Sequence, residues 1–211
     1  MEQTPVPIAA VEDVGTDAIA IEFETPDEFD AHPGQFVKLI VTADGEETSR
    51  FYTISSPTVS DTFELTIEID PDGDVTPLLA ELQAGDEVVL SGPYGNAFYE
   101  GESDVLILAG GPGVGPAVGI AQRVVDDGGD AAVVYRDDDP IHEKRLDALR
   151  ESGAKITVIP DGTPLDEPVA SLLSPGAQVF VYGFADFLDD SMDAIAAAGG
   201  EPDTAKVENF G

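Results

Sequence analysis

The first half of the chain alternates apolar and polar residues with a period of two, a pattern typical of half-buried strands. Turn-forming sequences separate the runs, for example HPGQ at 32–35 and PDGD at 71–74. The alternation predicts strands at 17–24, 36–42, 50–55, 62–70 and 86–91, with one helical segment at 76–83. Short strands at this spacing predict a small antiparallel β-barrel or sandwich.

The second half changes to nearly continuous apolar runs that alternate with helical segments, as in a parallel sheet covered on both faces. The predicted strands are 104–109, 131–135, 155–159, 178–182 and 206–210. The predicted helices lie near 115–127, 141–152, 166–173 and 186–198. The chain of 211 residues is long enough for two cores. We therefore predict an antiparallel β-barrel domain over 1–102 and a doubly wound α/β domain over 103–211.

Charge excludes several classes of partner. The formal net charge is −34, so we expect no binding to nucleic acid or to anionic membranes. No cysteine is present, which excludes disulfides, thiol nucleophiles and cysteine-ligated iron–sulfur clusters within these residues. With two histidines, His32 and His142, we expect no metal site. No signal-peptide pattern and no apolar run of about 18 residues occurs, so we expect a soluble cytoplasmic protein.

The acidic residues are dispersed and form no single tail. Residues 1–102 carry 23 acids and two bases, and residues 103–211 carry 20 acids and seven bases. This distribution favours a surface adapted to very high salt, as in a halophile, where self-repulsion is screened. The competing interpretation, an acidic protein that mimics DNA, predicts a chain without cofactor signatures.

The segment RFYTISSP at 50–57 places chemically useful groups at the end of one predicted strand. Arg50 is one of two bases in its half of the chain, and a guanidinium matches phosphate oxygens. Tyr52 offers a flat ring and Thr53 a hydroxyl. The octapeptide alone is equally compatible with a core tyrosine beside a surface ion pair.

The segment LILAGGPGVGPAVGIAQ at 106–122 runs from an apolar strand through a glycine-rich turn into a helix. Such turns let the backbone and a helix N-terminus approach a pyrophosphate. The glycines at 110, 111, 113 and 115 fit this use. Tight turns between a strand and a helix also use glycine for geometry alone, so the turn by itself leaves both interpretations open.

Several motifs, taken in order, resemble those of the ferredoxin–NADP reductase-like family. RFYTISS resembles its R-x-Y-[ST]-x-x-[ST] flavin signature, and HPGQFV before it resembles its P-G-Q stretch. LTIEIDPDGDVT resembles the family's flavin-pyrophosphate turn, and AGDEVVLSGPYGNAF its G-D…G-P-x-G stretch. The glycine turn resembles G-G-x-G-x-x-P, and the final VENFG resembles E-x-F-G. Pro112 stands where the family has Thr or Ser, and Tyr182 and Phe184 replace Cys and Pro of its C-G-P stretch.

The resemblance implies an NAD(P)H-dependent flavin oxidoreductase. The barrel would bind FAD and the α/β domain NADP or NAD. Hydride would pass from the nicotinamide nucleotide to the flavin, and electrons would leave to a separate protein acceptor, such as a ferredoxin or an oxygenase component. The choices of FAD over FMN, of NADPH over NADH, and of acceptor stay open.

The resemblance also assigns residues. Arg50 would hold the flavin pyrophosphate, Tyr52 would pack on the flavin, and Thr53 would bond near its reactive nitrogen. Arg136 would meet a 2′-phosphate and give a mild NADPH preference, unless it pairs with Asp137–Asp139. We expect catalytic roles for Thr53, Tyr52 and Glu208, and a surface position for His142. The expected cofactor-binding residues are Arg50, Phe51, Tyr52, Thr53, Ser56, Ile67, Gly73, Val75, Thr76, Gly111, Gly113, Val114, Gly115, Arg136, Gly183 and Phe210.

Two alternatives remain at this point. One is an electron-transfer subunit of a larger complex of the dihydroorotate dehydrogenase type, although such subunits usually carry a cysteine-ligated cluster. The other is a non-enzymatic flavin-binding module with an empty nucleotide site, which the substitutions at Pro112 and Tyr182 favour.

Overall fold

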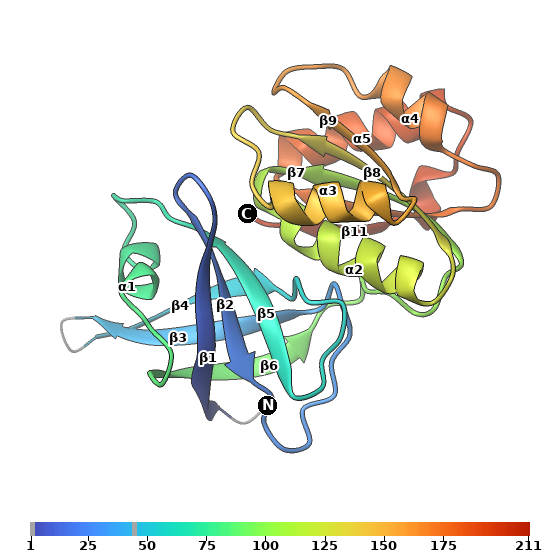
Figure 1. The fold of residues 1–211 in the computed structure, drawn as a ribbon. Helices are drawn as coiled ribbons and strands as arrows, with labels where there is room; N and C mark the ends of the chain where they lie inside the picture. The colour runs from blue at the N-terminus through green and yellow to red at the C-terminus, as the bar shows by residue number, and fades with distance from the viewer. Residues whose placement is uncertain (1–2, 44–45) are drawn as a thin grey trace.

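The computed structural model describes residues 3–43 and 46–211, which form an antiparallel sheet followed by a parallel one (Figure 1). The antiparallel sheet has six strands in the order β4-β3-β6-β1-β2-β5. The bounds are β1 Thr4–Gly15, β2 Ala18–Glu24, β3 Phe36–Ala43, β4 Glu46–Thr53, β5 Thr62–Glu68 and β6 Glu87–Tyr94. A short helix, α1 (Thr76–Ala80), lies between β5 and β6. The two outermost strands approach each other through the bridge between Ile54 and Leu65, so the sheet is barrel-like.

Strand β1 was not predicted from the sequence. Pro5 and Pro7 interrupt its alternation, and its pairing register shifts between Ile8 and Ala10. Residues Thr4–Pro7 pair with β6 and residues from Ile8 onward pair with β2. The prolines therefore lie where the strand has one neighbour, which is where a missing backbone donor is tolerated.

The second sheet is parallel, with its five strands in the order β11-β10-β7-β8-β9. The strand bounds are β7 Asp104–Gly110, β8 Asp130–Arg136, β9 Lys155–Ile159, β10 Gln178–Gly183 and β11 Lys206–Asn209. The helix bounds are α2 Val114–Asp126, α3 Glu143–Glu151, α4 Asp166–Leu172 and α5 Ala185–Ala197, with 3-10 turns η1 (Gly111–Gly113) and η2 (Pro202–Thr204). The strand order reverses between β7 and β10, which confirms the predicted doubly wound sheet.

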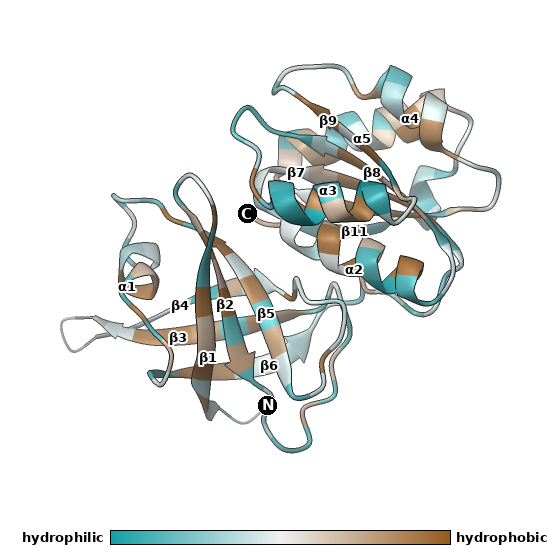
Figure 2. Ribbon diagram, in the orientation of Figure 1, coloured by the Kyte–Doolittle hydropathy of each residue, from teal (hydrophilic) through white to brown (hydrophobic). Residues whose placement is uncertain are grey.

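Helices cover both faces of the parallel sheet. On β7, Val105 and Ile107 pack in a core with α2 and α3, whereas Leu106 and Leu108 pack in a second core with α4 and α5. This two-sided burial explains the unbroken apolar runs in the sequence. The strands of both sheets are correspondingly rich in hydrophobic residues, and polar residues concentrate on loops and outer helix faces (Figure 2). No helix in the described residues is long and apolar enough to cross a membrane.

The two domains meet along the outward face of β5. Arg145 at the start of α3 forms an ion pair of 2.7 Å with Glu64 and donates to the carbonyl of Ser55 at 2.9 Å. Two residues further along β5, a hydrogen bond of 2.7 Å joins Thr66 Oγ1 to His142 Nε2. The expected boundary after residue 102 lies between the end of β6 and the start of β7, and it stays a prediction.

The expectation that His142 lies on the surface is wrong, because only 3% of this residue is exposed to solvent. Its backbone adopts a φ of 58° before α3, and its N–H donates to the carbonyl of Val14 in the barrel. Burial, with a smaller effect of the nearby Arg145 charge, lowers the pKa of the His142 ring to about 3. The charged residues that follow His142 in the sequence concealed this contact between the domains.

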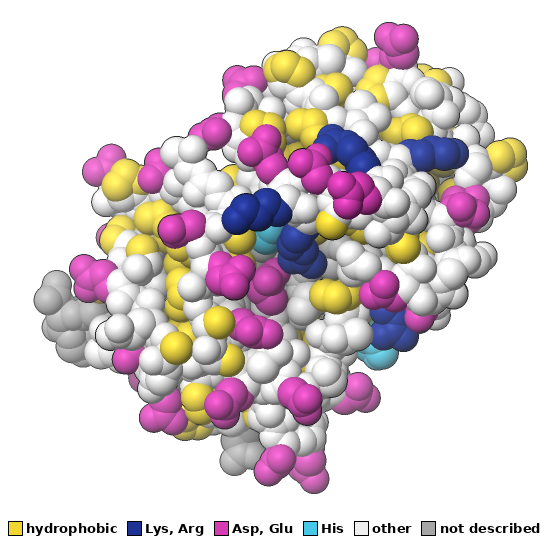
Figure 3. All heavy atoms as spheres, in the orientation of Figure 1, with side chains coloured by type: hydrophobic (Ala, Val, Ile, Leu, Met, Phe, Trp, Pro, Cys, Tyr) yellow, Lys and Arg dark blue, Asp and Glu magenta, His cyan; other side chains and the backbone are white. Residues whose placement is uncertain are grey.

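Acidic side chains are spread over both domains in the space-filling view (Figure 3). Basic side chains appear mostly on the second domain and near the line where the domains meet. The view agrees with the dispersed pattern of acids in the sequence.

Candidate flavin and nucleotide site

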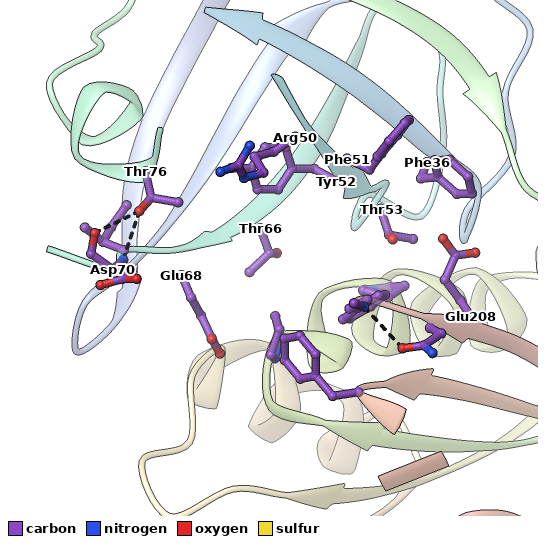
Figure 4. A pocket seen from close by; sticks show the side chains of 17 residues that line it. Phe36, Arg50, Phe51, Tyr52, Thr53, Thr66, Glu68, Asp70, Thr76 and Glu208 are labelled. Atoms are coloured by element: carbon purple, nitrogen blue, oxygen red, sulfur yellow. Dashed lines mark hydrogen bonds between the residues drawn. The ribbon is translucent and has the colours of Figure 1, made fainter. Parts of the chain in front are cut away.

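A cavity of about 700 Å³ lies between the two domains, with the C-terminus at its edge (Figure 4). This volume is within the ~300–1,000 Å³ typical of small-molecule and cofactor sites. The lining residues come from the barrel strands, the turn after β7, the turn after β10 and the chain end. They are Phe36, Arg50, Phe51, Tyr52, Thr53, Thr66, Glu68, Ile69, Asp70, Thr76, Pro112, Pro116, Phe184, Glu208, Asn209, Phe210 and Gly211.

Strand β4 supplies the cation of the barrel wall. The Arg50 guanidinium donates to the carbonyl of Ser49 at 2.9 Å, and within the described part of the chain it forms no ion pair. Its remaining donors are available to a ligand, and their planar arrangement suits phosphate oxygens. Next to it on the strand, Phe51 is 62% exposed although it is large and apolar.

Tyr52 carries a buried hydroxyl for which the described residues offer no hydrogen-bond partner. Burial raises the pKa of this phenol to about 12, and the Arg50 charge has a smaller, opposite effect. The group is therefore a neutral donor and acceptor in a cavity wall. A buried polar atom without a partner costs about 1–3 kcal/mol, so a ligand that bonds to it gains affinity.

The turn between β5 and α1 is closed by Thr76 and Asp70. The Thr76 hydroxyl donates to the carbonyl of Asp70 and accepts from the Asp70 N–H, each at 3.0 Å. Gly73 donates to the same carbonyl at 3.0 Å. Val75 is buried in the barrel core, so its side chain does not face the cavity.

The wall from the second domain contains the glycine turn and the start of α2. A Cβ at Gly113 would lie 2.2 Å from the carbonyl oxygen of Tyr182, and a Cβ at Gly115 would lie 2.8 Å from the Thr66 side chain. Close approach to β10 and to the barrel therefore requires both glycines, independently of any nucleotide. Pro112 and Pro116 are the residues of this turn that face the cavity.

The last residues close one end of the cavity. The Phe210 N–H donates to the carbonyl of Gly183 at 3.0 Å, and its ring meets Phe184 edge to face at 6.1 Å. Burial raises the pKa of Glu208 to about 7. Near neutral pH this carboxyl is thus able to release or accept a proton.

Tyr182 does not reach the cavity in place of the family's cysteine. Its ring is fully buried beneath the domain interface, and its hydroxyl donates to the carbonyl of Ala97 in the preceding domain. It stabilises the contact between the domains.

Arg136 lies at the end of β8 and does not line the cavity. It forms an ion pair of 2.7 Å with Asp190 and lies 4.8 Å from the centre of the Phe187 ring. The partner is on α5, and it is not one of the expected acids at 137–139. The Asp190 carboxylate offsets the charge of the Arg136 guanidinium, which therefore attracts a 2′-phosphate less strongly.

The structure brings some of the predicted site residues to the cavity. Those that line it are Arg50, Phe51, Tyr52, Thr53, Thr76, Glu208 and Phe210. Those that lie outside its lining are Ser56, Ile67, Gly73, Val75, Gly111, Gly113, Val114, Gly115, Arg136 and Gly183. Ile67 and Val114 are fully buried in the cores, and the Ser56 hydroxyl accepts from the N–H of Glu64. The roles expected for both sets stay predictions.

Sequence reasoning missed Thr66 and Glu68, which flank Ile67 on β5 and line the cavity. The signal was the alternation itself: if the side chain of Ile67 faces the core, those of residues 66 and 68 face outward. Phe36 was missed because its cross-strand pairing with Thr53 depends on the strand register.

These groups fit a flavin dinucleotide in the barrel wall. Among the residues that the structure describes, Arg50 keeps donors free for a diphosphate and the Tyr52 hydroxyl is unpaired, while Phe36 and Phe51 add flat apolar surface. The second wall offers a strand, a glycine turn and the N-terminus of α2, which suit a second diphosphate.

Comparison with known proteins gives the same result. Residues 5–99 match the family described as "Oxidoreductase FAD-binding domain". The chain is 29% identical to the ferredoxin reductase component of 3-ketosteroid-9-alpha-monooxygenase from Mycolicibacterium smegmatis, over 96% of this chain and 64% of that protein. It is 44% identical to the glycine betaine monooxygenase reductase subunit of Chromohalobacter salexigens, over 44% of this chain and 27% of that protein. The chain thus spans less than two thirds of the length of these relatives.

Among solved structures, the chain is similar to a ferredoxin NADP+ reductase from Neisseria gonorrhoeae with bound FAD and NADP. The TM-score is 0.80 at 19% identity, and the match covers 100% of both chains. The first domain therefore matches an oxidoreductase FAD-binding family, and the two domains together have the same fold as that reductase.

Proposed function

We propose that this chain is an NAD(P)H-dependent flavin reductase that passes electrons through FAD to a separate protein acceptor, such as an oxygenase component or a ferredoxin. The observation that carries the proposal is one cavity with two complementary walls. Arg50 and Tyr52 stand on the barrel wall, and the turn after β7 stands on the other. Relatives named as reductase components of monooxygenases support the choice of acceptor.

FAD supplies the redox chemistry when it is bound, taking a hydride equivalent from a reduced nicotinamide and releasing electrons to an acceptor. The chain's own residues bind and orient. Arg50 holds the flavin diphosphate, the Tyr52 hydroxyl finds its partner on the ligand, and Thr53 directs its hydroxyl to the ring. Phe210 and Phe184 would give one end of the cavity an apolar wall.

Glu208 holds the exchangeable proton of the site. Burial raises its pKa to about 7, so it is largely protonated below neutral pH and ionised above it. Because Glu208 lies beside the cavity, the proton on its carboxyl oxygen is within reach of a ligand that is reduced there. At saturating nucleotide, where differences in affinity no longer matter, we expect a rate of flavin reduction that depends on pH near 7 and loses this dependence in Glu208→Gln.

The test is the visible spectrum of the purified protein before and after anaerobic addition of NADH or NADPH. We expect a yellow protein whose flavin absorbance bleaches with one or both nucleotides. A colourless protein that does not take up added FAD would overturn the assignment. Bound flavin that neither nucleotide reduces would favour the non-enzymatic flavin-binding module, which Pro112 and Tyr182 had left open.

A further inference from the structure

Three side chains at alternate positions of β5, namely Glu64, Thr66 and Glu68, point toward the second domain and form what we call the outer row of β5. The first two have complementary partners there: Glu64 pairs with Arg145, and Thr66 bonds to His142. Glu68 differs. Within the described residues it forms neither an ion pair nor a side-chain hydrogen bond, and it extends from the strand toward the second domain (Figure 4).

The surroundings of Glu68 are the glycine turn and another acid. A Cβ at Gly111, the first residue of η1, would lie 3.8 Å from Glu68 Oε1. Across the cleft, Asp137 follows β8, and its carboxylate is fixed by the Tyr135 hydroxyl at 2.9 Å and by the Asp139 N–H at 2.8 Å. Of the cations on this side of the molecule, Arg136 pairs with Asp190 and Arg145 with Glu64, whereas Arg50 stands on β4 in the same cavity and forms no ion pair within the described residues.

On the basis of the proposed function, we propose that Glu68 is a specificity-determining residue of the nucleotide site. Its carboxylate opposes the entry of a pyrophosphate into the turn after β7. The amides and dipole of a strand–turn–helix unit attract an anion, and a carboxylate in front of that turn subtracts from the attraction. Through Glu68, the barrel domain therefore lowers the affinity of the second domain for a pyrophosphate. Nucleotides that contain a pyrophosphate experience the effect, and a nicotinamide riboside without phosphate does not.

The effect depends on pH. Burial, followed by the charge of Asp137, raises the pKa of Glu68 to about 7. Below that pH the carboxyl is neutral and the turn accepts the pyrophosphate, whereas above it the carboxylate is charged and binding weakens. The affinity for NADH is thus expected to fall as the pH rises through about 7.

The other titratable groups around the cavity are separable from Glu68. The pKa of Glu208 also lies near 7, but this residue is on β11 at the other end of the cavity, beside Gly95. The pKa of Tyr52 is raised to about 12, and that of His142 is lowered to about 3, so neither changes charge near neutrality. Burial raises the pKa of Tyr135 still further.

The experiment measures the Kd of ADP-ribose by calorimetry on the flavin-loaded full chain, at the lowest salt in which it stays folded. Glu68→Gln removes the charge and keeps the shape, and Glu87→Gln, at the exposed first residue of β6, is the control that changes net charge equally. At about pH 8.5 we expect Glu68→Gln to bind about tenfold more tightly than wild type, and at about pH 5.5 to agree within about twofold. The control is expected to follow wild type at both values.

Flavin reduction by reduced nicotinamide riboside, which lacks a pyrophosphate, is expected to be the same in wild type and Glu68→Gln. If Glu68→Gln binds ADP-ribose with the wild-type pH dependence, or more weakly, the inference is overturned while the proposed function stands. If no variant binds ADP-ribose at any pH, the nucleotide part of the proposed function fails, and this inference fails with it.

Discussion

Arg50 in the barrel and Arg136 in the second domain each stand near the end of a strand that leads to the cleft, yet their surroundings differ. Arg50 contacts a backbone carbonyl and forms no ion pair within the described residues. Arg136 is bound to Asp190 and packed against Phe187. The other arginines of the second domain, namely Arg123, Arg145 and Arg150, also form ion pairs with acids.

This difference indicates two ways of holding a diphosphate. The barrel wall keeps its cation for the ligand, as expected for a cofactor that stays bound. The second wall uses its cations for its own structure and leaves the ligand to the amides and dipole at the start of α2. Weaker binding, without a side-chain cation on the diphosphate, suits a nucleotide that must leave after each turnover.

We expect the largest effect from salt, which tests the two domains against each other because they differ in their ratio of acids to bases. Residues 1–102 have 23 acids and two bases, whereas the second domain has 20 acids and seven bases, most of them in ion pairs. At 1 M salt the Debye length is about 3 Å, so surface charges no longer repel across the molecule. We expect the fold and the bound flavin to be most stable above about 1 M KCl, and the barrel to unfold first on dilution.

Flavin fluorescence follows the barrel, and helical circular dichroism follows the second domain. Measured across a range of KCl concentrations, flavin release is expected to precede the loss of helix. An unfolding midpoint that is flat, or highest in dilute buffer, would contradict the interpretation of this surface as adapted to salt.

Arg50→Ala is expected to weaken flavin binding by roughly 1.5–3 kcal/mol, the value of one charge-assisted hydrogen-bonded contact. The free energy of unfolding of the flavin-free chain should change little, because Arg50 has no ion pair to lose among residues 3–43 and 46–211. Fluorescence titration with FAD measures the first quantity and denaturant unfolding the second. Arg123→Ala, which breaks a surface ion pair with Asp127, is the matched control and should retain full flavin affinity. Equal effects of the two substitutions would contradict the role of Arg50.

Gly119→Ala tests how closely the two walls must approach. Alanine favours a helix by about 1 kcal/mol over glycine, but a Cβ here would lie 2.5 Å from the Ser55 carbonyl oxygen. We expect a net loss of about 1–3 kcal/mol in the free energy of unfolding at fixed high salt. Gln122→Ala on the same helix should stay within about 0.5 kcal/mol of wild type. If Gly119→Ala has a higher free energy of unfolding than wild type, the interface between the domains has shifted to accommodate the added methyl group.

Asp190→Asn is expected to have the smallest effect. Removing the partner of Arg136 frees its guanidinium, which should lower the KM for NADPH by about three- to tenfold and leave that for NADH within about twofold. The wild-type protein is then expected to prefer NADH, in contrast to the mild NADPH preference that the sequence suggested. Steady-state kinetics with both nucleotides checks this. If Arg136→Ala raises the KM for NADPH alone in the wild-type background, the ion pair opens for the phosphate and the sequence-based preference stands.

Much of the fold was predictable because each strand or helix has a local periodicity. The parallel strands were found from apolar runs that depend on burial on both faces, and the reversal of strand order followed from alternating strands and helices. Strand β1 was missed because Pro5 and Pro7 obscure its alternation, and only its pairing with two different neighbours explains why they are tolerated there.

The candidate site was predictable where the residue type itself carries the chemistry. Arg50, Tyr52 and Thr53 lie on one short strand, so their proximity is a local property of the chain. The alternation along β5 turns Glu68 outward, but only strand register and the contact between the domains bring Glu68 and Phe36 to the same cavity.

The sequence by itself determined the match of the first domain to a flavin-binding family, the two-domain fold and the large negative charge, because these depend on motifs, periodicity and composition. The tertiary structure alone decided what each charged group meets. Arg136 faces Asp190, 54 residues away in the chain, and Arg145 faces Glu64, 81 residues away. It also placed Glu68 close enough to Asp137 for that charge to add to the effect of burial in raising the Glu68 pKa. Electrostatic partners are set by distances of a few ångströms, and only the packing of the two domains fixes those distances.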